Sequence, residues 1–218
     1  LQEGYAANAT GHKGAVHVID DAIAEDGSVF LVMEYLDGVC VNDLWEDRDL
    51  RLSPRVSLSI AHDLLDILVT AHATRIIHRD IKPSNVLIAE YDDEPVPKVI
   101  DFGVAKALHQ PLTDHSVYTG VFLAIGTLAY MSPEQAELSG LDIDIRSDIY
   151  SLGVLLYELL TGRAPFDQRS LMEAGLDEIR RTVREVEPTR PIRFLVDLFD
   201  SPGNASICVA DENRSIPG

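Results

Sequence analysis

Residues 78–85, His-Arg-Asp-Ile-Lys-Pro-Ser-Asn, decide the interpretation of this chain, together with Asp101-Phe102-Gly103, which begins sixteen residues after Asn85. The first segment carries a carboxylate on Asp80 and an ammonium group on Lys82, and each segment adds an oxygen-bearing side chain, on Asn85 and on Asp101. Six specified residues at roughly one in twenty each give the first segment a chance frequency of about 10⁻⁸ per starting position. A polar turn on a soluble domain needs no such combination, so we interpret these residues as a functional site.

The composition limits the classes of protein to consider. At 218 residues the chain is long enough for one sizeable core or two small lobes. Its 46% hydrophobic and 25% charged residues are typical of a soluble globular protein. Asp and Glu outnumber Lys and Arg by 36 to 18, which gives a formal net charge of −18. This charge disfavours binding to nucleic acid or to anionic lipid surfaces, and it favours attraction of a peptide that carries basic residues.

Cysteine usage and hydropathy bear on location. The two cysteines, Cys40 and Cys208, have no metal-binding or redox spacing, so we expect a reducing, cytoplasmic compartment. No run of eighteen apolar residues and no charged-then-apolar leader occurs, so we expect no membrane segment. The chain opens with Leu1 rather than Met, within an expected helix, and we expect it to be part of a longer protein.

The order of apolar and turn-forming residues predicts both helices and strands, an α+β fold. A helix end at residues 3–10, stopped by Gly11, precedes a hairpin of Ala15–Ala24 and Val29–Tyr35. Ser53-Pro54 opens a long helix, because serine caps a helix well and proline fits its first turn. The apolar positions of that helix are Val56, Ile60, Leu64, Leu65, Ile67 and Leu68. The other predicted elements are a short helix near 42–47, and strands at 86–89 and 98–100 around a turn at 91–97. We also expect an apolar helix that Ser147 caps and that Thr161-Gly162 closes, and an amphipathic helix at 170–186.

From Glu3 to about Pro191 the sequence resembles a bacterial serine/threonine protein kinase of the eukaryotic-like type. Besides residues 78–85 and 101–103, the motifs that carry the resemblance are Gly126–Glu134 (Gly-Thr-Leu-Ala-Tyr-Met-Ser-Pro-Glu) and Ser147–Gly153 (Ser-Asp-Ile-Tyr-Ser-Leu-Gly), in the order that the family has. The resemblance implies a protein-kinase-like two-lobed fold. We expect a partial N-terminal β lobe at residues 1–37, a mostly helical C-terminal lobe at 38–191 and an irregular tail at 192–218.

The resemblance also implies a reaction, transfer of the γ-phosphoryl group of ATP to a serine or threonine of a protein. Asp80 would accept the proton of the substrate hydroxyl and hold its oxygen in line. Lys82 would neutralise charge on the transferred group, and its position is similar to that in the serine/threonine subclass. Asn85 and Asp101 would hold Mg²⁺, which prefers such hard oxygen ligands. The cofactors expected are therefore ATP and Mg²⁺.

A second set of residues would bind the nucleotide. Val29–Leu36 resembles the strand that leads into the hinge between the lobes. In that comparison Met33 lines the back of the adenine pocket, and the backbones of Glu34 and Leu36 hydrogen-bond the adenine edge. Leu87 would close the pocket from below. Without the other motifs, residues 29–36 would simply be a buried strand.

Further roles follow from the resemblance. Thr127 would hydrogen-bond Asp80 and Lys82 and help to select hydroxyl substrates. Glu134 would pair with an arginine late in the domain, for which Arg214 is a candidate. Asp148 would hold the backbone of the catalytic loop, and His78 and Phe102 would pack in the stack that links the lobes.

Arg79, beside Asp80, suggests control by phosphorylation, because an arginine at this place can pair with a phosphate that arrives in the loop. Thr119 is the preferred acceptor, with Thr113 and Ser116 as alternatives. The other interpretation of these three residues is that they are solvated loop hydroxyls.

The chain departs from the family at its start. Glu3 resembles the helix glutamate that should pair with a strand lysine, but neither that lysine nor a glycine-rich loop is present in the sequence given. We therefore expect little activity from these residues alone. Three hypotheses stay open: an N-terminally truncated kinase domain from a longer protein with the capacity to dimerise, a degenerate kinase-fold scaffold, and a fragment that does not fold alone.

Overall fold

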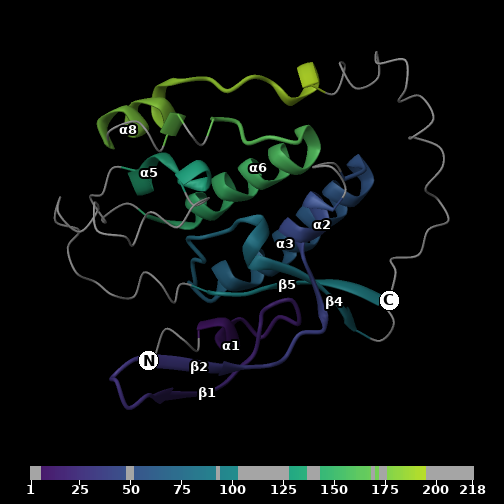
Figure 1. The fold of residues 1–218 in the computed structure, drawn as a ribbon, viewed down its shortest axis with the longest axis vertical. Coiled ribbons are helices and arrows are strands. Elements are labelled where there is room, and N and C mark those ends of the chain that lie inside the picture. The colour runs from purple at the N-terminus through teal and green to yellow at the C-terminus, as the bar shows by residue number, and fades with distance from the viewer. Residues whose placement is uncertain are drawn as a thin grey trace.

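Three layers follow one another in the computed structural model (Figure 1). A hairpin with a short helix lies at one end, a three-stranded sheet follows, and helices form the other end. The structure describes residues 6–47, 52–91, 94–102, 128–136, 143–167, 170–171 and 176–194. This arrangement agrees with the predicted α+β class and with a partial two-lobed kinase fold.

The first layer confirms the predicted helix end and hairpin. Helix α1 (Ala6–Thr10) is followed by Gly11 at φ 63°, a conformation that favours glycine. Strands β1 (Val18–Ile23) and β2 (Val29–Met33) pair antiparallel. Their turn is closed by a hydrogen bond from the Ala24 amide to the Ser28 carbonyl at 2.8 Å, and Gly27 adopts φ 85° within it.

The second layer has the strand order β3–β4–β5, formed by Gly38–Cys40, Val86–Tyr91 and Glu94–Val99. The predicted strands at 86–89 and 98–100 were too short, because Pro95 and Pro97 were assigned to a turn and lie in β5. The Val99 amide donates away from β4, to the Gly14 carbonyl at 2.7 Å. Since backbone direction alternates along a strand, Pro95 and Pro97 face the same way as Val99, and their missing N–H groups cost no bond to β4.

Helices α2 (Val41–Glu46) and α3 (Pro54–Ala73) begin the third layer. The side chain of Ser53 accepts a hydrogen bond from the Val56 amide at 3.3 Å and caps α3, as predicted. The buried positions of α3 include Ile60, Leu64, Ile67 and Leu68, whereas Val56 and Leu65 of the predicted stripe are exposed.

By length and composition α3 could cross a membrane, and it is the one helix of the described ranges that could. It contacts α6, β5 and α1, and its buried stripe lies in the main core cluster, as expected of the central helix of a globular domain.

The remaining helices are α5 (Pro133–Ala136), α6 (Ile145–Thr161) and α8 (Leu176–Glu185), with short 3₁₀ turns η1 (Pro83–Asn85) and η3 (Leu128–Tyr130). The prediction that Ser147 caps α6 was wrong. Asp144 is the cap, because its side chain accepts from the Arg146 amide at 2.8 Å, and Ser147 lies buried in the first turn. Gly162 at φ 77° ends the helix, as predicted.

The main core joins α3, α6 and the second layer around Leu64, Leu155 and Val99.

Candidate active site

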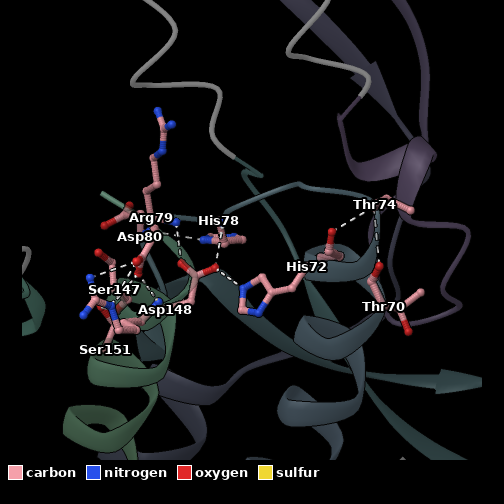
Figure 2. A network of polar contacts seen from close by, with 12 residues as sticks. Thr70, His72, Thr74, His78, Arg79, Asp80, Ser147, Asp148 and Ser151 are labelled. Atoms are coloured by element: carbon pink, nitrogen blue, oxygen red, sulfur yellow. Dashed lines mark hydrogen bonds and ion pairs between the residues drawn. The ribbon is translucent and has the colours of Figure 1, made fainter. Parts of the chain in front are cut away.

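The site rests on one buried carboxylate, that of Asp148 in α6 (Figure 2). Asp148 is fully buried, and its Oδ2 accepts hydrogen bonds from the His78 amide at 2.9 Å and from His72 Nε2 at 2.8 Å. Its Oδ1 accepts the Arg79 amide at 2.7 Å. These three donors satisfy a charge that would otherwise be costly to bury. The role expected for Asp148, holding the backbone of residues 78–79, is confirmed.

Arg79 is held in an unusual backbone conformation. Its φ of 69° lies in the left-handed region, which costs a non-glycine residue about 1–2 kcal/mol. Two bonds offset this cost: Asp148 accepts its amide, and the Gln135 side-chain amide donates to its carbonyl at 2.8 Å. The turn directs the chain from the end of α3 towards Asp80.

The imidazole of His78 joins the two halves of the site. Its Nδ1 accepts the Asp80 amide at 3.2 Å, so Nε2 carries the proton and donates to the Ile100 carbonyl at 2.9 Å. Complete burial lowers the pKa of His78, which keeps the ring neutral in this tautomer. Phe102 packs on it edge to face, with ring centroids 4.8 Å apart. Asp101 directly follows Ile100, so the His78 ring connects the backbone at Asp80 to the backbone next to Asp101. The two aspartates therefore lie near one ring rather than on opposite sides of the molecule.

Lys82, predicted to be catalytic, and Asn85, predicted to hold Mg²⁺, both contact the Asp80 carboxylate. Its Oδ2 forms an ion pair with Lys82 Nζ at 2.8 Å and accepts from Asn85 Nδ2 at 3.0 Å. The same Asn85 nitrogen also donates to the Asp80 carbonyl at 2.8 Å. Within the described ranges, Oδ1 of Asp80 has no hydrogen-bond partner, so one oxygen stays available to accept a proton.

Asn85 and Asp101 are connected through the backbone. The Ile100 amide donates to the Asn85 carbonyl at 3.0 Å, which fixes β5 against η1. Asp101 follows with a left-handed φ of 62°, and its carboxylate is exposed. Asn85 is 6% exposed and donates through Nδ2, which leaves its Oδ1 as an acceptor. A neutral oxygen and a carboxylate fit the ligand preference of Mg²⁺.

The donor set is too small to hold a metal ion alone. Within the described ranges, no three His, Cys, Asp or Glu side chains gather into a metal-binding group. Asn85 and Asp101 thus fit a magnesium ion that takes most of its other ligands from nucleotide phosphates and water.

The predicted adenine-pocket residues lie at the junction of the first two layers. Met33 ends β2 and is 38% exposed, Leu36 packs partly on the main core, and Leu87 in β4 is half-buried opposite Cys40. Glu34 has its side chain directed elsewhere: Oε1 accepts Lys98 Nζ at 3.0 Å and the His17 amide at 2.8 Å.

The segment 128–136 is fastened to α6. Ser151 Oγ donates to the Tyr130 carbonyl at 2.8 Å, and the Tyr130 hydroxyl donates to Glu158. Burial raises the pKa of Glu158 to about 7. Glu134 accepts a hydrogen bond from Ser147 Oγ at 2.6 Å, and Arg214, the arginine expected to pair with it, lies outside the described ranges.

Several predicted residues lie outside the described ranges. They are Glu3, Gly103, Thr113, Ser116, Thr119, Thr127, Cys208 and Arg214. Their predicted roles stay predictions.

Sequence reasoning missed two contacts that build the catalytic loop and one ion pair beside the predicted adenine-pocket residues. His72 is the third donor to Asp148, Gln135 holds the Arg79 carbonyl, and Lys98 pairs with Glu34. Of these three contacts, the sequence signals only the one made by Gln135, because this residue directly follows the motif that ends in Ser132-Pro133-Glu134. The partners of His72 and Lys98 lie 76 and 64 residues away in sequence.

Comparison with known proteins agrees with this geometry. Residues 1–201 match the family described as protein kinase domain. The serine/threonine-protein kinase pkn3 of Myxococcus xanthus is 36% identical over 92% of this chain and 35% of its own length. PknB of Mycolicibacterium smegmatis is 39% identical over 90% of this chain and 30% of its own length. The chain thus spans about a third of the length of these curated relatives.

A solved structure shares the fold. The crystal structure of the Mycobacterium tuberculosis PknI kinase domain matches with a TM-score of 0.63 at 23% identity, over 90% of this chain and 64% of that chain. The family match covers most of the chain, and its motifs form the network around Asp148 and His78. The chain therefore belongs to the protein kinase domain family, among the bacterial serine/threonine kinases of the eukaryotic-like type.

Proposed function

We propose that Asp80, Lys82, Asn85 and Asp101 carry out transfer of the γ-phosphoryl group of ATP to a serine or threonine hydroxyl of a protein. The observation that supports these roles most strongly is the contact of Lys82 and Asn85 with one oxygen of Asp80, while the other oxygen has no partner in the described ranges. The ion pair orients the carboxylate, and the available oxygen is the one that accepts the hydroxyl proton.

The reaction balances without another reactant. The substrate oxygen bonds to the γ-phosphorus, the bond from that phosphorus to the bridging oxygen of ADP breaks, and the hydroxyl proton passes to Asp80. Lys82 stabilises negative charge on the transferred group. Asn85 and Asp101 would hold Mg²⁺, which neutralises phosphate charge when bound. Met33, Glu34, Leu36 and Leu87 would contact the adenine, and Thr127 would help to position the hydroxyl.

The domain bounds, the location and the partners of the protein are proposals as well. We assign residues 1–37 to a partial N-terminal lobe, 38–191 to the helical lobe and 192–218 to a tail. We place the protein in the cytoplasm, with a protein substrate whose basic residues suit the net charge of −18. Dimerisation through other parts of the protein is compatible with this assignment.

Activation by phosphorylation is proposed for Thr119, with Thr113 and Ser116 as alternatives. Arg79, next to the catalytic carboxylate, supports this idea. Phosphopeptide mapping after incubation with ATP should find phosphate between residues 113 and 127; phosphate found only elsewhere would contradict the proposal.

The test of the function is phosphoryl transfer from radiolabelled ATP by the full-length protein. Asp80→Asn should lower kcat by about 10²–10⁴-fold, because it removes the proton acceptor and keeps the shape of the side chain. Asp43→Asn, an exposed aspartate in α2, is the matched control and should leave kcat unchanged. Equal activity of Asp80→Asn and the unaltered protein would exclude the proposed role.

Residues 1–218 tested alone should turn over slowly, because they carry neither a glycine-rich loop nor the strand lysine. Robust transfer by these residues would contradict this expectation. A full-length protein that binds partners but transfers no phosphate would favour a kinase-fold scaffold instead.

A further inference from the structure

A hollow of about 400 Å³ is lined by residues of α1, of the segment 11–17, of β4 and of β5, together with Glu34. Its lining includes Lys13, His17 and Glu34 from the first layer and Tyr91 and Lys98 from the second. Of the residues proposed to contact the nucleotide, Glu34 belongs to this lining, but Asp80, Lys82, Asn85 and Asp101 do not. The hollow is therefore separate from the site around Asp80.

Lys98 is the buried cation of this hollow. Its side chain is 9% exposed, and its ammonium group bonds to Glu34 Oε1 at 3.0 Å. An ammonium group has three N–H donors, and within the described ranges Glu34 Oε1 is the one acceptor that bonds to it. A buried donor without an acceptor is costly, so two of the three donors favour an additional oxygen ligand.

The carboxylate of Glu34 is already shared. Burial acts to raise the pKa of Glu34, but the bonds from Lys98 and the His17 amide outweigh it and lower the pKa below its ordinary value. The same Oε1 accepts both donors, so Glu34 supplies Lys98 with one oxygen. Glu34 therefore neutralises Lys98 with one oxygen, and among the described residues no second acceptor bonds this ammonium group.

The charges around the hollow run against those of the whole chain. Its lining contains two ammonium groups, on Lys13 and Lys98, two imidazoles, on His12 and His17, and one carboxylate, on Glu34. The chain as a whole has a net charge of −18. Glu34 offsets one of the two ammonium groups, and Asp66 bonds the His12 ring at 3.2 Å. The lining itself keeps an excess of one positive charge, so an anion is repelled less here than over the carboxylate-rich remainder of an acidic chain.

We propose that this hollow is a binding site for a compact oxyanion, a phosphate or carboxylate group of a small ligand. Lys98 would donate to the oxyanion from the floor of the hollow, and exposed Lys13 would add a second charge at its rim. His17 belongs to the lining, so the NMR signals of its ring should shift when an anion binds. The proposal does not depend on phosphoryl transfer at Asp80.

Isothermal titration of the protein with pyrophosphate and, separately, with citrate tests the proposal, without magnesium and at constant ionic strength. Saturable binding of either probe with a Kd of about 1 mM or tighter is expected, and the tighter probe identifies the chemistry. No saturable binding of either probe up to about 10 mM would overturn the proposal.

Variants separate the hollow from the catalytic site, which also attracts phosphates. Lys98→Met should abolish binding, and Lys13→Gln should weaken it about threefold, as removal of one screened charge does. Lys82→Gln should leave binding in the hollow intact, and Arg193→Gln, an exposed arginine outside the lining, is the matched control. Binding lost in Lys82→Gln but kept in Lys13→Gln and Lys98→Met would assign it to the catalytic site and refute the inference.

The ring signals of histidines locate the bound probe even if Lys98→Met fails to fold. Addition of the probe should shift the His12 and His17 resonances and leave those of His72, beneath the catalytic loop, unchanged. Shifts at His72 without shifts at His12 and His17 would also contradict the site.

Discussion

In the catalytic loop the structure depends on buried polar groups, whereas the β1–β2 hairpin carries exposed apolar groups. Asp148, His78 and Asn85 are at most 6% exposed, and each is hydrogen-bonded. In the hairpin Ile19, Ile23, Phe30 and Val32 are 42–64% exposed. Among the described side chains, none from β1 or β2 belongs to the main core cluster.

The contrast separates two sources of order. The catalytic loop is held by bonds that form only in one arrangement, so loss of a single partner should disturb the whole site. The hairpin is held by backbone pairing, by its own turn and by two hydrogen bonds between the Asn8 side chain and the Val18 backbone. A two-stranded hairpin with so few further contacts has marginal stability. Four predictions test this difference.

The largest effect is expected at Asp148. Asp148→Asn should lower the free energy of unfolding by about 4 kcal/mol, because the amide removes a buried charge and cannot accept three hydrogen bonds in the same way. Asp144→Asn on the same helix is the matched control, with a change below about 0.5 kcal/mol, since asparagine caps as well as aspartate. Urea unfolding measures both, and equal stabilities would remove Asp148 as the anchor.

A pair of truncations compares the two regions directly. Leu64→Ala, at a fully buried position of α3, should cost about 3 kcal/mol through lost packing and the cavity it leaves. Phe30→Ala, 48% exposed in β2, should cost less than about 1 kcal/mol. Thermal or urea unfolding checks the order; a larger loss for Phe30→Ala would show that the hairpin is as well packed as the core.

The neutral state of His78 gives the catalytic loop a pH dependence. The folded pKa of His78 is lowered, so its contribution to stability is complete above the unfolded value of about 6.5 and is lost as pH falls towards the folded pKa. The loss is at most about 1.4 kcal/mol for each pH unit. Unfolding measured between pH 7 and 5, with the His78 ring followed by NMR, checks this; a folded His78 that protonates above pH 6.5 would contradict it.

The smallest effect concerns the ion pair beside the hairpin. The folded pKa of Glu34 is lowered, so its contribution is present above the unfolded value of about 4.3 and is lost as pH falls through the folded pKa. Glu34→Gln should cost about 0.5–1 kcal/mol at pH 7, and less at pH 3, since the Glu34 side chain is 31% exposed and glutamine still offers Lys98 an oxygen. The same loss at both pH values would show that the charge of Glu34 contributes nothing.

The sequence was most informative where residue types have one chemical use. The spacing of residues 78–85 and 101 predicted that Asp80, Lys82 and Asn85 lie close together, and it identified Asp148 through its motif. The hairpin, α3 and the end of α6 at Gly162 followed from turn and cap signals.

It was less informative where a contact joins distant segments. The proline residues of β5 looked like a turn because the direction of their missing N–H groups depends on how β5 pairs with Gly14 and Val16. Ser147 looked like a cap because its burial against Glu134 is a tertiary contact. Lys98 has no local signal at all, since its partner is set by how the hairpin meets the second layer.

The most direct test of the central claim is an experimental structure of the full-length protein with a non-hydrolysable ATP analogue and Mg²⁺. The account predicts a magnesium ion about 2.0–2.1 Å from an oxygen of Asn85 and of Asp101. It also predicts the γ-phosphate beside Lys82 and Asp80. A nucleotide bound with its phosphates away from Asp101, or a metal ion that touches neither residue, would contradict it.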